Sequence, residues 1–192
     1  MDASEMFLIR HRRLHSHVER LTEGLSEEQI RERVHPLANP LAWLLWHIAR
    51  SEDGAINLLV RDGSQVLDDD WSARLNIPRR DAGTGMTMSE VDELAASVDL
   101  GSLMAYWRAV GERTADLVGS LRASDLDELV CLERARRAAE LLAEGPGVAH
   151  LVELWPGRTR GDFLVWLALT HSYEHVGQAD LIRGLLGRPG RF

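Results

Sequence analysis

Two pairs of histidines have a spacing that could bind a metal ion. The chain contains eight histidines, and His15 follows His11 by four positions, as His175 follows His171. Residues four apart lie on one face of a helix, with Cβ atoms about 5–6 Å apart, so two imidazoles can reach one ion. The C-terminal pair falls within an apolar stripe over residues 164–185. Because an unpaired imidazole in an apolar core costs free energy, and a divalent ion would satisfy both rings, this position favours a metal site.

His47 is the natural third ligand. It lies on the apolar side of another predicted helix, between Leu44 and Ser51. Three neutral imidazoles leave coordination positions for water or substrate, as in catalytic sites, whereas structural sites usually have four protein ligands. The alternative that the spacing leaves open is three core histidines that hydrogen-bond to backbone or carboxylate groups.

The other histidines are weaker candidates. His11 is followed directly by two arginines, and nearby positive charge disfavours a cation. His15 and the next histidine, His17, face different sides of their predicted helix. His35 and His150 are expected in loops at the surface.

Polar residues near the three candidate ligands have less defined roles. Ser51 and Gln178 lie one helical turn from a ligand and could orient an imidazole or a bound water. Glu52, Asp53 and Glu174 are close in sequence but fall on other helix faces, where solvated charges are expected. The sequence therefore predicts no general base and no other catalytic residue by number.

Two arginines and the one cysteine complete the set of candidates. Arg50 and Arg183 could hold an anionic thiol or substrate, although surface ion pairs are the commoner fate of arginines. Cys131, the single cysteine, is expected to be a small core residue. One cysteine excludes a disulfide framework within the chain and a four-cysteine metal site.

Hydrophobic periodicity predicts four long amphipathic helices that would position these residues. They cover about 4–23, 40–61, 100–121 and 160–186. Asn39 and Asp99 are predicted N-caps of the second and third helices. The connection over 64–87 contains one predicted turn near Trp71, and a short helix follows from Ser89. Alternating β patterns are scarce, so we expect an all-α four-helix bundle with a long crossover connection. Four tryptophans are expected to fill its core: Trp43, Trp46, Trp107 and Trp166.

A small helical insertion is predicted beside the bundle. Residues 131–150 have the pattern of a helix that ends at Gly145, Pro146 and Gly147, and residues 151–160 are predicted as loop or a short extended piece. The chain length of 192 residues fits one domain over 1–192.

Charge and hydropathy exclude several classes of protein. Acidic residues number 30 against 22 basic residues, which gives a net charge of −8 and disfavours a nucleic-acid-binding protein. No run of 18 apolar residues and no signal peptide is evident, so we expect no membrane span and a cytoplasmic location. The expected partner is a small-molecule substrate.

Two segments in combination resemble a known family. WLLWHIARSEDGAINLL over 43–59, followed much later by HSYEHVGQADLIRGLLG over 171–187, is similar to the DinB-like (damage-inducible) metal-binding proteins, also grouped with the YfiT-like proteins. The resemblance implies a four-helix bundle with unusual connections, often as a homodimer. It also implies a divalent metal held by three side chains, which here fall on His47, His171 and His175.

The resemblance also indicates a class of reaction. Similar proteins include thiol-dependent isomerases and S-transferases that use mycothiol, bacillithiol or glutathione, and many others have no known activity. Zn²⁺ or Ni²⁺ suits imidazole ligands and binds sulfur, and a metal-bound thiol is deprotonated. We therefore expect a divalent metal cofactor, together with a low-molecular-weight thiol, in an S-transferase or isomerase. A hydrolase that uses metal-bound hydroxide and a non-catalytic metal-binding stress protein remain as alternatives.

Overall fold

A computed structural model of the chain describes residues 2–144 and 146–188. The described residues form helices and no strand, which confirms the all-α prediction. None of their helices is long and apolar enough to cross a membrane. In chain order the elements are α1 (Ala3–Arg20), α2 (Glu27–Arg31), α3 (Leu41–Gly54), η1 (Ala55–Val60), α4 (Asp69–Leu75), α5 (Met88–Ser97), α6 (Leu100–Ser120), α7 (Ala123–Leu126), α8 (Leu132–Leu142), α9 (Pro146–Leu154), α10 (Arg160–Val165), η2 (Trp166–Thr170) and α11 (His171–Leu185).

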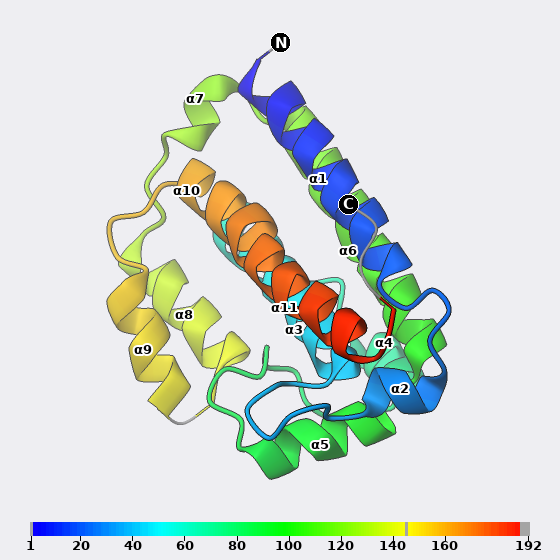
Figure 1. Cartoon of the computed structure of the whole chain (residues 1–192). Helices are drawn as coiled ribbons and strands as arrows, with labels where there is room; N and C mark the ends of the chain where they lie inside the picture. The colour runs from blue at the N-terminus through cyan, green and yellow to red at the C-terminus, as the bar shows by residue number, and fades with distance from the viewer. Residues whose placement is uncertain (1, 145, 189–192) are drawn as a thin grey trace.

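Four long helical segments pack around one another. They are α1, α6, α3 with its continuation η1, and the run of α10, η2 and α11 (Figure 1). α1 contacts α6 and α11, and α3 contacts both of the same helices. Every residue of α3 is buried. This helix, which carries His47, therefore has no face in solvent.

Side-chain caps begin α1 and α6 but not α3. Asp2 accepts a hydrogen bond from the backbone N–H of Glu5 at the start of α1, and Asp99 caps α6 as predicted. α3 begins one residue later than predicted, because Pro40 has an extended backbone and occupies the N-cap position itself. Asn39 therefore does not act as the N-cap.

Three of the four tryptophans predicted in the core are found there. Trp43, Trp46 and Trp107 are buried among apolar side chains, as expected. Trp166 was also expected in the core but is only partly buried. The guanidinium carbon of Arg158 lies 4.3 Å from the centre of its ring, which is the geometry of a cation–π contact at the surface.

The long crossover returns the chain to α3. It contains α4, which is longer than the single turn predicted near Trp71, and α5. Between these helices the loop passes directly over α3 at Gly83, whose φ is +85°. A Cβ atom at this glycine would come within 2.7 Å of the Trp46 side chain, so only glycine allows the loop to lie so close. This approach brings the carbonyl of Ala82 to the site.

The prediction of one inserted helix over 131–150 is wrong in part. α8 covers much of that range, but a second helix, α9, begins at Pro146 and continues through Leu154 into the segment predicted as loop. Proline is favoured at a first helical position, because its missing N–H would have no helical partner there. Leu151 and Val152 pack against the core and stabilise the helix. Gly145 of the predicted stop lies outside the described residues.

Candidate metal centre

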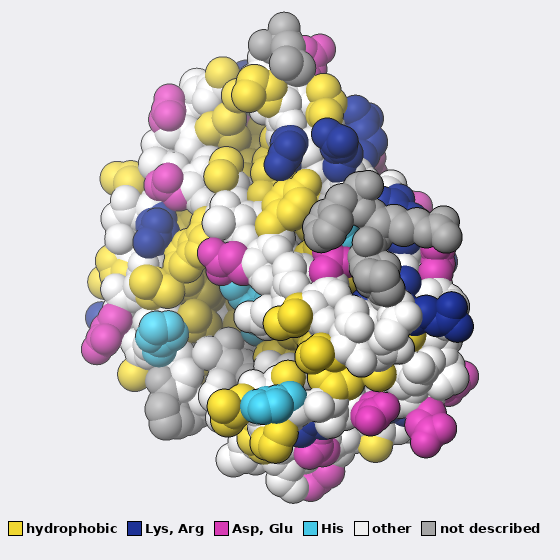
Figure 2. Space-filling view, in the orientation of Figure 1, with side chains coloured by type: hydrophobic (Ala, Val, Ile, Leu, Met, Phe, Trp, Pro, Cys, Tyr) yellow, Lys and Arg dark blue, Asp and Glu magenta, His cyan; other side chains and the backbone are white. Residues whose placement is uncertain are grey.

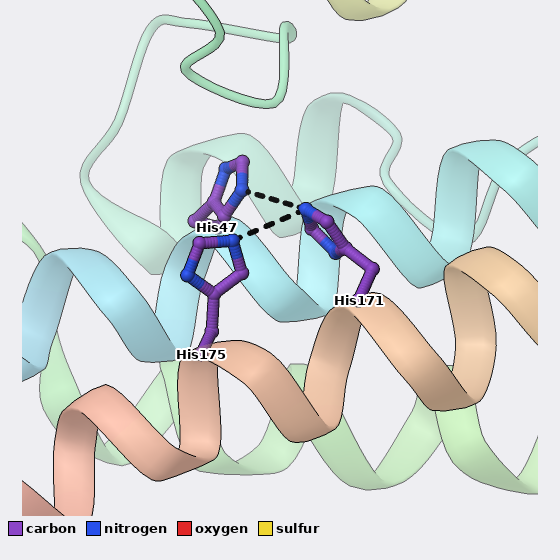
Figure 3. A group of neighbouring side chains, drawn as sticks. All are labelled: His47, His171 and His175. Atoms are coloured by element: carbon purple, nitrogen blue, oxygen red, sulfur yellow. Dashed lines mark hydrogen bonds between the residues drawn. The ribbon is translucent and has the colours of Figure 1, made fainter.

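Three histidine side chains from two helices meet at one point. His47 comes from α3, and His171 and His175 come from the first two turns of α11 (Figure 3). The Nε2 atom of His171 lies 3.2 Å from Nε2 of His47 and 3.1 Å from Nε2 of His175. One ring nitrogen from each lies within 4.8 Å of the other two. The fold therefore brings together the three residues that the sequence suggests as ligands.

Hydrogen bonds on the outer side of two rings orient their lone pairs. Nδ1 of His47 donates to the carbonyl oxygen of Ala82 at 2.5 Å, and Nδ1 of His175 donates to Oε1 of Gln178 at 3.1 Å. A neutral imidazole carries one N–H, so Nε2 of both rings presents a lone pair to the centre. If Nε2 of His171 carried the hydrogen, it could donate to His47 or to His175 but not to both. Nδ1 of His171 has no hydrogen-bond partner among the described residues. A cation at the centre would satisfy the converging lone pairs.

The spacing of the nitrogens fits a divalent ion. An ion bound at about 2.0–2.1 Å by each imidazole separates its ligand nitrogens by roughly 2.8–3.4 Å, the lower end for octahedral and the upper end for tetrahedral geometry. The two separations of 3.1 and 3.2 Å lie in that range. The donor set and its geometry thus suit a metal without rearrangement of the helices.

Local packing holds the rings in place. The Trp43 ring stacks on His47, with centroids 4.6 Å apart and planes 9° from parallel. Immediately before His171 the helix widens into the π-helical segment η2, a feature that often marks functional sites. The hydroxyls of Thr170 and Ser172 donate to carbonyl oxygens five residues earlier, which ties the widened turn together.

Burial keeps the three imidazoles neutral. The pKa of His47 is lowered to about 3, first by burial and then by the neighbouring charges of His171 and His175. The pKa of His171 is lowered to about 4 by burial and by His175, and burial also lowers the pKa of His175. Neutral imidazole is the form that binds a metal ion.

These shifts predict how the stability of the metal-free protein depends on pH. An imidazole in the unfolded chain has a pKa of about 6.5, so unfolding takes up protons below that pH. The free energy of unfolding should therefore be highest above about pH 6.5 and should decrease as the pH falls toward 4. His47 and His171 should each contribute a slope of up to about 1.4 kcal/mol per pH unit. Urea unfolding of the chelator-treated protein at several pH values between about 4 and 6.5 measures this free energy. The His47→Gln variant should show a smaller slope, and a pH-independent unfolding free energy would contradict the prediction.

A cavity opens onto two of the three histidines. Its volume is about 470 Å³, and His47 and His171 are in its wall. The crossover loop around Gly83 forms one side, and α8 and α9 form another. Figure 2 shows apolar side chains around a hollow in the face of the molecule that is turned toward the viewer. The described residues of its lining include three tryptophans and no arginine.

The residues predicted on an outer face of α3 are buried instead. Arg50, Glu52 and Asp53 are all fully buried, so the expectations of solvated carboxylates and a surface ion pair are wrong. The physical reason is the central position of α3, whose every side is covered by another segment. Glu52 contacts His11 and His15, and so these two histidines form a cluster separate from the first.

The remaining predicted residues are scattered. Ser51 lines the cavity, as does Glu174, which is exposed. Arg183 donates to the backbone carbonyl oxygen of Leu21, away from the cavity. Cys131 is exposed, so its prediction as a core residue is wrong.

His35 and His150, both predicted in surface loops, lie in different surroundings. His35 is exposed in a loop, as expected. His150 is also exposed, but it lies on α9 and lines the cavity. No sequence pattern indicated that α9 lines the cavity or that the Ala82 carbonyl reaches His47. A backbone carbonyl has no residue-type signal, and only the path of the crossover reveals it.

Comparison with known proteins identifies the family. The family model of the DinB superfamily matches residues 10–179, so this chain belongs to the DinB superfamily. The crystal structure of a conserved protein from Enterococcus faecalis is similar, with a TM-score of 0.72 and 20% identity over 97% of this chain and 99% of that chain. At this identity the likeness shows the fold alone. No curated protein matches the chain.

Proposed function

We propose that His47, His171 and His175 bind a divalent ion, Zn²⁺ or Ni²⁺, and that the protein is a metal-dependent thiol S-transferase or isomerase. The observation that carries the proposal is the convergence of three Nε2 atoms beside an apolar cavity. An ion held there lowers the pKa of a thiol bound to it, so that the thiolate exists at neutral pH.

The chain's own residues position and protect the reactants. Ala82 and Gln178 fix the imidazole tautomers, and Trp43 fixes the plane of the His47 ring. The apolar wall from α8 and α9 excludes water from the second substrate. No side chain needs to act as a general base, in keeping with the sequence analysis, which found none.

The lining of the cavity favours an uncharged thiol. Glutathione and bacillithiol carry carboxylates, and enzymes hold such groups with arginine or lysine. The chain has no lysine, and the described lining contains no arginine. The two arginines suggested by sequence are engaged elsewhere, Arg50 with Asp53 and Arg183 with a backbone carbonyl. Mycothiol, which has no carboxylate, fits this lining best.

Cobalt substitution tests the proposal. The Co²⁺ protein should develop a sulfur-to-cobalt charge-transfer band when mycothiol is added, and a weaker response to glutathione or bacillithiol at equal concentration. The Cys131→Ala variant should keep both the band and thiol transfer, because the reactive sulfur comes from the added thiol and Cys131 is exposed away from the cavity lining.

The same experiment separates the alternatives. If no thiol changes the cobalt spectrum while a simple ester is hydrolysed, the hydrolase replaces the transferase. If neither occurs although the ion is bound, the protein is a metal-binding protein without this chemistry.

A further inference from the structure

A second group of ligand-type side chains lies between α1 and α3. Nε2 of His11 is 2.7 Å from Oε1 of Glu52, and Nε2 of His15 is 3.1 Å from Oε2 of the same carboxylate. The two imidazole centroids are 4.3 Å apart. Glu52 is fully buried, His11 is 2% exposed, and the His15 side chain is 15% exposed. None of the three residues lines the cavity of the first site.

The charge of Glu52 is balanced differently from that of its neighbour Asp53. Asp53 is equally buried, but it pairs with the guanidinium of Arg50 and accepts hydrogen bonds from a tyrosine hydroxyl and two backbone N–H groups. Against Glu52 the described residues place two imidazoles and no permanent cation. A fully buried carboxylate requires a positive partner. Here that partner is either a protonated imidazole or a metal ion.

A glycine of α6 leaves space for the His15 ring, and one helical turn further along α6 lies a buried hydroxyl without a partner. His15 stacks on Trp107 of α6 at 3.7 Å, beside Gly111. A Cβ atom at Gly111 would lie 2.2 Å from the His15 ring, so this glycine gives the imidazole its place. Thr114, one turn further on the same stripe of α6, is fully buried, and its hydroxyl has no hydrogen-bond partner. An unpaired buried hydroxyl is unfavourable, and a water bound to an ion between α1 and α3 would be able to supply its missing partner.

We infer that His11, His15 and Glu52 form a second divalent-cation site, distinct from the site beside the cavity. Two imidazoles and one carboxylate are a ligand set that Zn²⁺ takes and that also suits Fe²⁺ or Co²⁺. The ligand separations of 2.7 and 3.1 Å are within a few tenths of an ångström of those around an ion bound at about 2.0–2.1 Å. Small side-chain rotations are enough to admit it.

The burial of the three ligands indicates a structural ion, with two imidazole nitrogens and both carboxylate oxygens as its four donor atoms. The ion joins α1 to α3. Because α3 also carries His47, the ion helps to hold that ligand of the first site in position. The partly exposed His15 provides the entry route from solvent.

Metal counting on the whole chain, prepared without a polyhistidine tag, tests this inference. The protein is stripped with chelator, equilibrated with Zn²⁺, freed of excess ion, and analysed for zinc per chain. We expect two ions in the unmodified protein, one in Glu52→Gln and one in His171→Ala. The combined variant should bind none. The His17→Ala variant is the matched control, because His17 is on α1 but pairs with Asp180, and it should keep both ions.

A second variant and a second measurement guard against misfolding of Glu52→Gln. His15→Gln should also lose one ion, and Co²⁺ bound to His171→Ala should give visible d–d absorption that is absent in His171→Ala/His15→Gln. One ion in the unmodified protein and none in His171→Ala would overturn the inference and would show that protons balance Glu52. One ion that survives His171→Ala but not Glu52→Gln would support the second site and contradict the first.

Discussion

Replacement of His171 by alanine should remove the ion from the site beside the cavity and abolish thiol transfer. Nε2 of His171 lies next to Nε2 of both other histidines, so its loss leaves two imidazole ligands where the site has three. A free thiol with a pKa of about 8.5 is only a few per cent thiolate at neutral pH. Together with the loss of positioning, this predicts a fall in transfer rate of about 10²–10³-fold.

Zinc per chain and the transfer rate with mycothiol measure this effect. The variant should contain one ion fewer than the unmodified protein. The control is His150→Ala, which removes a histidine that lines the same cavity without approaching the three-histidine cluster, and which should leave zinc per chain unchanged. Equal zinc content in His171→Ala and the unmodified protein would refute the assignment of the ligands.

Replacement of Arg50 by methionine should destabilise the fold by about 3–5 kcal/mol, because it leaves a buried carboxylate without its cation. The guanidinium is fully buried and donates to Asp53 at 3.0 Å and to the hydroxyl of Tyr106 at 2.8 Å. It also donates to Oε1 of Gln65 and to a backbone carbonyl of the crossover. For a chain of this size the expected fall in melting temperature is roughly 6–20 °C.

Thermal and urea unfolding of matched variants measure the contribution of this ion pair. Arg80→Met serves as the control, since the Arg80 side chain is half exposed and pairs with an exposed carboxylate, and it should change the unfolding free energy by less than about 0.5–1 kcal/mol. The double variant Arg50→Met/Asp53→Leu should recover part of the loss, because neither charge of this ion pair then remains buried. An Arg50→Met protein as stable as the control variant would contradict this account.

The buried ion pair of Arg50 and Asp53 also supports the candidate metal centre. Arg50 donates to the carbonyl oxygens of Arg80 and Asp81, the residues directly before Ala82 in the crossover. The Ala82 carbonyl in turn accepts the hydrogen bond from His47. The ion pair therefore holds the loop that sets the tautomer of His47.

Local sequence patterns were sufficient to predict the four long helices and the histidine pair on α11. Apolar residues at helical spacing require one face of each helix to be buried, so the four long helices could be predicted from local pattern. The four-residue spacing of His171 and His175 guarantees that they share a face once the helix forms. His47 could be added because it lies on an apolar stripe and because the two segments resemble one family.

The surroundings of those helices could not be predicted from local sequence patterns. A helical wheel assumes one face in solvent, but α3 is covered on every side, and this placed Arg50, Glu52 and Asp53 in the interior against partners distant in sequence. The Ala82 carbonyl and the cavity wall from α9 likewise depend on where the crossover and the inserted helices dock. Hydrophobic periodicity indicates which side of a helix is buried. The residues that pack against that side come from distant parts of the chain, so local pattern does not identify them.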